Sequence, residues 1–148
     1  MRRDRGELSR PSGRVLFSAR LPARPEAVEV ARHQIRDMLR LHGADRVAAD
    51  DAELLASEVV TNGVVHVGAN QPGTELVFSL MRDGDRLLVE VHDPSRELPC
   101  PRERPGELRE SGWGLFMVGM VAADHGVHLT ENKGKVIWFE LPAWPRER

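Results

Sequence analysis

Hydrophobic residues in the first third of the chain recur with two different periods. An apolar run at residues 15–17 among polar neighbours predicts a strand over residues 14–19, which Pro22 ends. From residue 25 to residue 42, apolar residues recur every three or four positions, which predicts an amphipathic helix that Gly43 ends. The apolar positions of this helix are Ala27, Val30, Ala31, Ile35, Met38, Leu39 and Leu41.

A second helix is predicted from about Asp45 to Val67, with Gly68 as its end signal. Its apolar residues, which we expect to face the core, are Val47, Leu54, Leu55, Val59, Val60 and Val64. Residues 75–82 and 86–92 then alternate between apolar and polar types on either side of Asp83-Gly84-Asp85. This pattern is typical of two strands joined by a tight hairpin turn.

The last third of the chain begins with an unusually long connection. Residues 94–111 contain four prolines among many charges, so they favour neither helix nor strand, and connections of this length are often functional. A third helix is predicted to start between Gly112 and Leu115 and to reach about Asp124. Residues 127–131 and 136–141 form a predicted closing hairpin around a glycine-containing turn.

The order of these elements predicts an α+β fold. Strand, helix, helix, two strands, loop, helix and two strands place the helices on one face of a mixed or antiparallel sheet, as a two-layer α/β sandwich. We expect a flexible basic tail at residues 1–12, one domain over residues 13–142 and a C-terminal tail at residues 143–148.

Composition and charge narrow the classes of partner. The 148 residues are 41% hydrophobic and 30% charged, which is typical of a soluble globular domain. A formal net charge of −2 predicts no nucleic-acid partner, and no apolar stretch approaches the ~20 residues of a membrane span. A single cysteine, Cys100, excludes a disulfide within the chain and favours the reducing cytoplasm.

The second predicted helix carries candidate chemistry. Glu58, Asn62 and His66 follow one another at steps of four, so an α-helix would stack them on one stripe. An amide oxygen at Asn62 suits Mg²⁺, and Glu58 could accept a proton one turn away. Gly63 costs helix stability and therefore indicates a reason such as a close backbone approach, with simple tolerance of glycine in the helix as the alternative. The alternative is a solvated polar stripe without a ligand.

Two further signals follow along the chain. Asp93 closes the second hairpin strand, where its carboxylate could accept a hydrogen bond from an adenine amino group, although an aspartate before a proline also serves in turns. The Gly112-Trp113-Gly114-Leu115 segment opens the third helix, where glycines and free amide groups suit a phosphate. Glycines there are also ordinary in loops.

In this order, the three signals resemble the N, G1 and G2 boxes of the gyrase, chaperone and histidine-kinase ATP-binding fold, known as the Bergerat fold. Within that superfamily the chain is similar to the stand-alone anti-sigma-factor serine/threonine kinases common in actinobacteria. The resemblance covers about residues 15–141 and rests on five blocks, at residues 58–66, 91–95, 110–115, 126–127 and 134–141.

The resemblance implies a set of ligands and roles. ATP and Mg²⁺ would be bound, with Glu58 as the general base, Asn62 as the Mg²⁺ ligand and Asp93 as the adenine partner. Gly112, Gly114 and Leu115 would form the phosphate-side turn. The loop over residues 94–111 would be the lid over the phosphates.

Two positions depart from the family pattern. Ser95 replaces the glycine that the wider superfamily has two positions after the G1 aspartate, and Gly63 replaces an alanine usual among the close relatives. We expect a stiffer entry to the lid and a looser helix beside the metal. Neither change removes a ligand, so the departures put efficient turnover in doubt more than ATP binding.

Two functions remain open on the sequence. The first is a kinase that phosphorylates a STAS-type anti-anti-sigma protein and acts as an anti-sigma factor, with a sigma factor or a second copy in a homodimer as further partner. The second is a nucleotide-dependent binding module without phosphoryl transfer. A complete histidine kinase is disfavoured, because His33 on the first helix lacks a phosphoacceptor box and the preceding segment is short.

Overall fold

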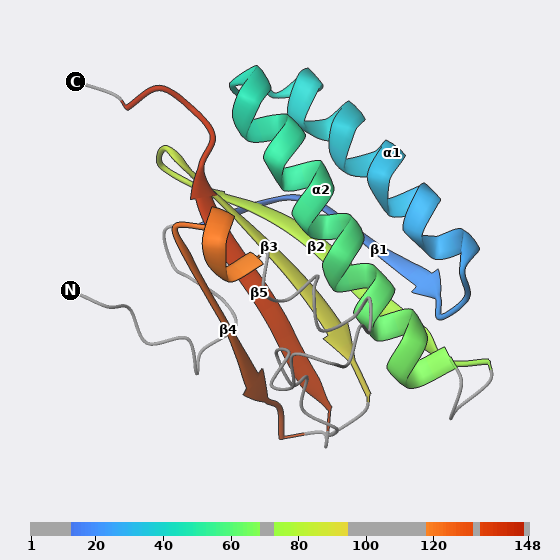
Figure 1. Ribbon diagram of the computed structural model, residues 1–148. Helices are drawn as coiled ribbons and strands as arrows, with labels where there is room; N and C mark the ends of the chain where they lie inside the picture. The colour runs from blue at the N-terminus through green and yellow to red at the C-terminus, as the bar shows by residue number, and fades with distance from the viewer. Residues whose placement is uncertain (1–12, 69–72, 95–117, 132–133, 147–148) are drawn as a thin grey trace.

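The computed structural model describes residues 13–68, 73–94, 118–131 and 134–146, and these form one sheet with helices packed on it (Figure 1). The elements in order are β1 (Arg14–Pro22), α1 (Glu26–Leu41), α2 (Arg46–Gly63), a short π-helix (Val64–Gly68), β2 (Glu75–Asp83), β3 (Arg86–Asp93), β4 (Asp124–Leu129) and β5 (Lys135–Pro142). A helical turn at residues 118–121 precedes β4. No helix in the described ranges is long and apolar enough to cross a membrane.

The five strands lie in the order β1-β2-β3-β5-β4, and every neighbouring pair is antiparallel. Both long helices lie on the same face of this sheet, so the predicted two-layer α+β sandwich is confirmed, with a fully antiparallel sheet among the described strands (Figure 1). The β2–β3 hairpin turns at Gly84, whose φ of 63° requires the left-handed region that glycine adopts readily.

Alternation along the strands divides the apolar residues between two faces. The larger cluster joins the helices to one face, with Phe78, Leu80, Val89 and Phe139 from the sheet and Ile35, Leu39, Leu55 and Val59 from the helices among its members. A smaller cluster of Met81, Leu88, Val136 and Trp138 lies on the opposite face. The larger cluster is therefore the core that holds the helix layer in place.

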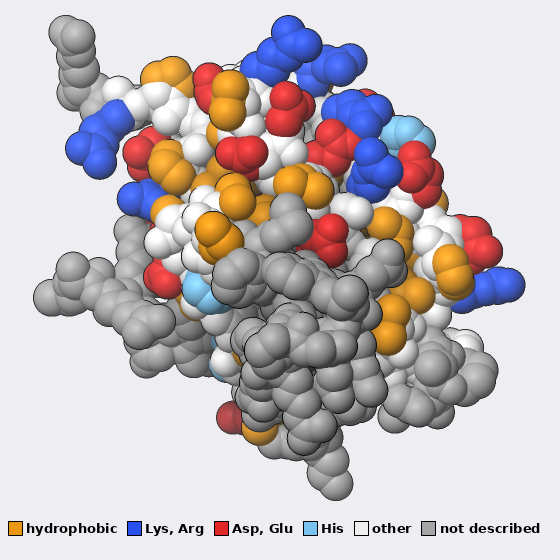
Figure 2. Space-filling model, in the orientation of Figure 1, with side chains coloured by type: hydrophobic (Ala, Val, Ile, Leu, Met, Phe, Trp, Pro, Cys, Tyr) orange, Lys and Arg blue, Asp and Glu red, His pale blue; other side chains and the backbone are white. Residues whose placement is uncertain are grey.

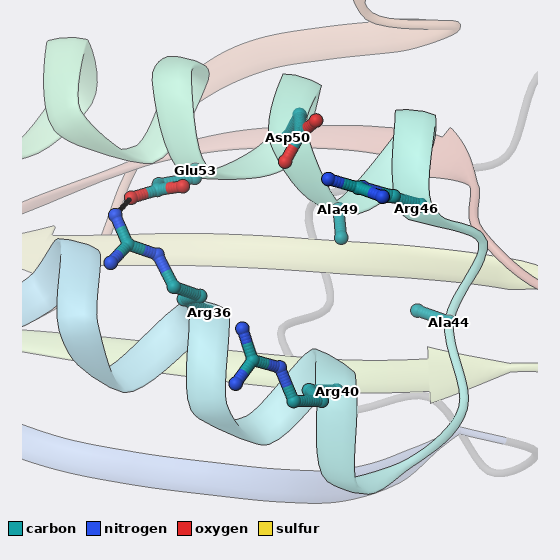
Figure 3. Close-up of a pocket in the computed structure, with 7 residues that line it drawn as sticks. All are labelled: Arg36, Arg40, Ala44, Arg46, Ala49, Asp50 and Glu53. Atoms are coloured by element: carbon teal, nitrogen blue, oxygen red, sulfur yellow. Dashed lines mark hydrogen bonds and ion pairs between the residues drawn. The ribbon is translucent and has the colours of Figure 1, made fainter.

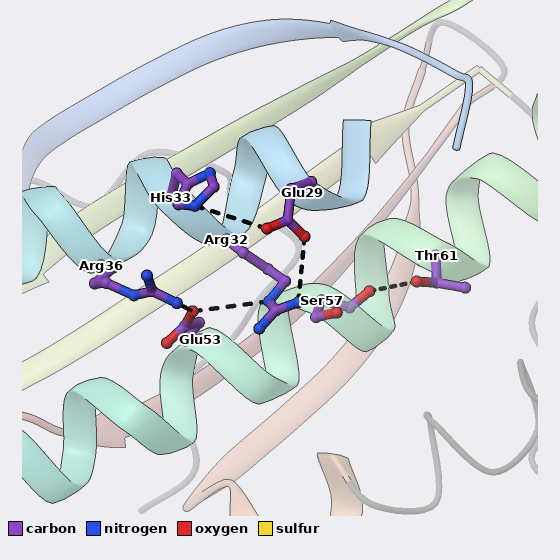
Figure 4. A network of polar contacts seen from close by, with 7 residues as sticks. All are labelled: Glu29, Arg32, His33, Arg36, Glu53, Ser57 and Thr61. Carbon is purple, nitrogen blue, oxygen red and sulfur yellow. Dashed lines mark hydrogen bonds and ion pairs between the residues drawn. The ribbon is translucent and has the colours of Figure 1, made fainter. Parts of the chain in front are cut away.

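Polar contacts connect the outer sides of α1 and α2. Glu53 of α2 accepts a hydrogen bond from Arg36 of α1 and also pairs with Arg32, as Figure 4 shows. The hydrogen bond to Glu53, aided by charge attraction, raises the pKa of Arg36 above its ordinary value. Asp45 caps α2 by accepting a hydrogen bond from the Ala48 backbone N–H. The pair of helices thus meets the sheet as one layer.

Two of the expected core residues of α2 face outward instead. Leu55, Val59 and Val60 are buried as predicted, but Val47 is 68% exposed and Leu54 is 43% exposed. Alanines take their places, because Ala48, Ala52 and Ala56 form the inward side of α2, which lies close to α1 and the sheet. These small alanines allow α1 and α2 to pack closely. The prediction missed them because it selected the larger apolar residues as the core positions.

The third helix and the closing hairpin differ from their predicted bounds. The predicted helix start at residues 112–115 lies outside the described residues, and Asp124, its predicted end, is the first residue of β4. The backbone N–H of Ala123 already donates to the Glu140 carbonyl, which draws the chain into the sheet. Gly126 favours this pairing, because a Cβ atom there would lie 2.9 Å from the Trp138 ring.

The expected C-terminal tail starts too early at residue 143. Ala143 and Trp144 belong to the core. The indole N–H of Trp144 donates to the His42 carbonyl at 2.9 Å, and the Arg82 guanidinium lies 4.2 Å from its ring centre. The packed part of the chain therefore continues to Trp144, because this aromatic side chain packs against the α1–α2 connection at His42.

We predict that Trp144→Ala lowers the free energy of unfolding by about 3–5 kcal/mol, because it empties a buried aromatic site and removes the donor to the His42 carbonyl. Chemical denaturation followed by circular dichroism measures this change. Arg146→Ala is the control, since Arg146 is exposed and pairs only loosely with Asp85. Equal stability of the two variants would contradict the assignment of Trp144 to the core.

Candidate functional site

Asn62, the predicted metal ligand, lies near the end of α2 with its side chain buried. The residue is 1% exposed, and neither its amide oxygen nor its amide nitrogen has a hydrogen-bond partner among the described residues. Burying an amide without partners costs free energy that folding alone does not return. A buried amide of this kind is suited to a ligand that reaches it from outside the described chain.

Gly63 explains how α2 reaches the sheet at this point. A Cβ atom on Gly63 would lie 2.9 Å from Leu76 Cδ1, so glycine allows the helix to contact the beginning of β2 closely. The neighbour is a side chain, whereas the sequence suggested a close backbone approach. Because Asn62 precedes Gly63, this contact also brings Asn62 down to the sheet.

The predicted stripe of Glu58, Asn62 and His66 begins in α2 and ends in the short π-helix. Glu58 and Asn62 lie one α-helical turn apart, and Glu58 is half-buried. After Gly63 the chain continues as a π-helix, whose hydrogen bonds span one residue more than those of an α-helix. His66 lies within this π-helix. Short π-helical turns occur often at functional sites.

Asp93, the predicted adenine partner, lies at the end of β3 and is buried. It pairs in the sheet with Lys135, the first residue of β5, and the Lys135 Nζ lies 2.8 Å from Asp93 Oδ2. Both side chains are almost completely buried, at 0% and 2% exposed. A buried ion pair therefore stands at the position where the sequence predicts a single carboxylate.

The sheet register brings these groups to one end of the molecule. Val77 of β2 pairs with His92 of β3, so Leu76 and Asp93 lie together at the same end of the sheet, and Lys135 follows in β5. Gly63 packs on that same Leu76. Asn62 from the helix layer and the Asp93–Lys135 pair from the sheet therefore approach the same end of the domain.

Gly134 lets β3 and β5 close on each other beside this pair. A Cβ atom at Gly134 would lie 2.5 Å from the Asp93 carbonyl oxygen, a distance that no other residue type could accept without moving the backbone. Thr130 completes the turn by accepting a hydrogen bond from the Gly134 N–H at 3.1 Å. The glycine thus holds Asp93 and Lys135 at ion-pair distance.

Sequence reasoning missed Lys135 as a site residue. A signal for it existed, because a lysine opens an otherwise apolar closing strand in a chain with only two lysines. Gly112, Gly114 and Leu115, predicted for the phosphate-side turn, lie outside the described residues, as does nearly all of the predicted lid over residues 94–111. Glu58, Asn62 and Asp93 are the predicted site residues that the structure describes.

Among the hollows that border the described residues, two are compared with the predicted site. The larger, about 670 Å³, lies between the C-terminal end of α1 and the start of α2, where Arg36, Arg40 and Arg46 surround Asp50 and Glu53 (Figure 3). It contains none of the predicted site residues. Figure 2 shows basic and acidic side chains interspersed over this outer face of the helices.

The smaller hollow, about 300 Å³, borders Asp93, Gly134 and Lys135. Val77 and His92 also line it, and they point away from the helices, so this hollow reaches the strand ends from the opposite face of the sheet. Among the described residues there is no group of three or more histidine, cysteine, aspartate or glutamate side chains that could hold a metal ion. A metal ion bound at Asn62, on the helix side of the sheet, would therefore need further oxygen ligands from a bound molecule.

Solved structures share this architecture. The RsbU and RsbW domains of a Mycobacterium tuberculosis protein match with a TM-score of 0.65 at 19% identity over 88% of this chain, which spans 33% of the length of that one. A chain of the SiaB–SiaC complex from Pseudomonas aeruginosa matches with a TM-score of 0.60 at 14% identity, covering 86% of this chain and 90% of its own. At these identities the likeness establishes the fold alone.

Sequence relatives agree with the fold. The serine-protein kinase RsbW of Oceanobacillus iheyensis is 29% identical over 116 residues, which cover 71% of this chain and 73% of the relative. The serine-protein kinase RsbW of Listeria monocytogenes is 26% identical over 132 residues, 82% of this chain and 84% of its own. The family model of the histidine kinase-like ATPase domain matches residues 21–141. Together with the antiparallel sheet and its helix layer, this match shows that the chain belongs to the histidine kinase-like ATPase domain family.

Proposed function

We propose that this protein is a Mg²⁺-dependent serine/threonine protein kinase that binds ATP and phosphorylates a STAS-type anti-anti-sigma protein, while a sigma factor is the target that it holds inactive. The observation that carries the proposal is the buried amide of Asn62, which lacks partners among the described residues and lies over the end of the sheet that bears Asp93. Relatives named serine-protein kinase support the choice of reaction.

Each described site residue has a role in this proposal. Asp93 accepts a hydrogen bond from the base of ATP, and Asn62 binds Mg²⁺ through its amide oxygen. Glu58, one helical turn from Asn62, accepts the proton of the serine or threonine hydroxyl as that oxygen attacks the γ-phosphorus. The bond between the γ-phosphorus and the bridging oxygen breaks, and ADP leaves. Catalysis depends mainly on positioning and charge neutralisation.

The described donors fit a magnesium nucleotide. An amide oxygen is a hard ligand of the kind that Mg²⁺ accepts, and one or two protein ligands suffice when phosphate oxygens and water complete the coordination. When bound, Mg²⁺ neutralises charge on the phosphates. The burial of Asn62 keeps its amide oriented before the nucleotide arrives, so less side-chain entropy is lost on binding.

The first test is nucleotide binding. We expect calorimetry to show saturable binding of Mg·ATP to the wild-type protein and affinity at least about tenfold lower for Asp93→Asn, which replaces an accepting oxygen with a donor. Asp85→Asn, in the β2–β3 turn at the other end of these strands, is the matched control. Absence of binding by the folded wild type would contradict an ATP-binding function.

Asn62 offers a test that separates ligand binding from stability. We predict that Asn62→Leu raises the free energy of unfolding of the nucleotide-free protein by about 1–2 kcal/mol, because an apolar side chain of similar shape replaces a buried amide without partners. The same change should remove the Mg²⁺ dependence of ATP binding. Thermal unfolding with and without Mg·ATP measures both effects.

Thr61→Val is the neighbouring control, because the Thr61 hydroxyl already donates to the Ser57 carbonyl at 2.7 Å, as Figure 4 shows. Its replacement should bring no gain in stability. If Asn62→Leu destabilised the protein as much as Thr61→Val does, the Asn62 amide would contribute to stability and would not be kept for a ligand.

Glu58 distinguishes the kinase from a nucleotide-dependent binding module. We predict that Glu58→Gln slows transfer of labelled phosphate from ATP to a STAS-domain substrate by at least about 100-fold, because a general base is lost, while affinity for ATP is unchanged. Glu53→Gln on the same helix is the control, since Glu53 faces α1. ATP binding without any transfer by the wild type would favour the binding module.

A further inference from the structure

Lys135 has surroundings unusual for a lysine. It opens β5 and is completely buried. Because side chains alternate along a strand, Lys135 lies on the same side of β5 as Ile137 and Phe139, which belong to the core under the helices. Asp93 lies on that side of β3 with Val89 and Val91. The ammonium group therefore points into the layer between sheet and helices, where the proposed nucleotide site lies.

Burying an ammonium group is costly unless its charge is paired and its N–H groups find acceptors. Asp93 supplies the charge, with 2.8 Å between Lys135 Nζ and Asp93 Oδ2. This contact does not have the alignment of a hydrogen bond, and Lys135 Nζ has no hydrogen-bond acceptor among the described residues. An ammonium group carries three N–H donors, so Lys135 retains donor capacity for a ligand.

The pair presents an acceptor and a donor side by side. A carboxylate oxygen accepts hydrogen bonds, and the adjacent ammonium donates them. The Watson–Crick edge of adenine has the complementary order, because its N6 amino group donates and the neighbouring ring nitrogen N1 accepts. Gly134 keeps the two strands close enough for both groups to meet one edge. Asp93 alone would recognise only the amino group.

We infer that Lys135 is a base-recognition residue, which donates a hydrogen bond to N1 of adenine while Asp93 accepts one from the N6 amino group. The inference rests on the proposed function, since it requires that Asp93 binds the base of ATP. It adds a contact to N1 that the sequence-based assignment of Asp93 does not contain. If Lys135 served only as a counter-ion for Asp93, the affinity for the nucleotide would not depend on which atom occupies position 1 of the base.

The test first compares two nucleotides on the wild-type protein and uses protein variants only afterwards. In 1-deaza-ATP a C–H group replaces N1, so the acceptor disappears while the amino group and the phosphates remain. We expect calorimetry on the wild-type protein to show about tenfold or greater preference for ATP over 1-deaza-ATP, because a charged hydrogen bond is lost. Equal affinity for the two nucleotides would overturn the role of Lys135, and no substitution is needed to obtain that result.

The Lys135→Met variant then tests whether Lys135 causes the preference for ATP over 1-deaza-ATP. Methionine is similar in length and apolar, so we expect weaker binding of ATP and a ratio between the two nucleotides close to one. Lys135→Gln serves the same purpose if the methionine variant fails to fold, which thermal unfolding reports. Arg40→Met, on the exposed end of α1, is the control and should keep the wild-type ratio.

The outcomes separate the two proposals. A wild-type preference that persists unchanged in the Lys135 variants would mean that another group donates to N1, and the inference would be wrong while the ATP site stands. Failure of folded wild-type protein to bind either nucleotide would instead overturn the proposed function, and the inference with it. A preference present in the wild type and lost with Lys135 establishes the contact.

Discussion

The contact between α2 and the sheet at Gly63 and Leu76 determines where the polar groups of this domain can meet. Without a side chain at Gly63, the helix comes within van der Waals contact of β2 at the end of the sheet where Asp93 and Lys135 lie. Asn62, the residue before Gly63, is buried. A larger residue at position 63 would displace either Leu76 or the helix, and the amide of Asn62 would move with it.

Among the described residues, three buried polar groups lie at this end of the domain, while two others, Glu90 and Glu140, lie along β3 and β5. Asn62, Asp93 and Lys135 are all buried, and folding gains little from an amide without partners or from an ion pair removed from water. Such groups are tolerated in natural proteins chiefly where a ligand compensates for their desolvation. Their presence at one end of the domain supports the binding site proposed there, at some expense of stability.

The family to which the chain belongs explains the architecture but not every residue of the site. The histidine kinase-like ATPase match extends over residues 21–141, and two relatives named serine-protein kinase RsbW are 29% and 26% identical to this chain over the aligned residues. In this chain Gly63 stands directly before the change from α-helix to π-helix at Val64. The ion pair of Lys135 with Asp93 is a second feature of the site that the structure describes.

The sequence by itself determined the succession of elements, because period and turn chemistry are local. The β2–β3 hairpin follows from alternation around Gly84, and α1 follows from its apolar spacing and the glycine after it. Glu58, Asn62 and Asp93 could be selected because their residue types and order match a known arrangement. The long connection over residues 94–111 was predicted from its prolines and charges, and nearly all of it lies outside the described residues.

Only the tertiary structure decided which groups meet. The pairing of β3 with β5 places Lys135 against Asp93 across more than forty residues of sequence, and no local pattern encodes that register. The outward position of Val47, the core position of Trp144 and the early start of β4 likewise depend on which surfaces the helices and strands cover. Burial and strand pairing are properties of the whole packed chain, so residues distant in sequence acquire their surroundings only when the sheet and the helix layer close on each other.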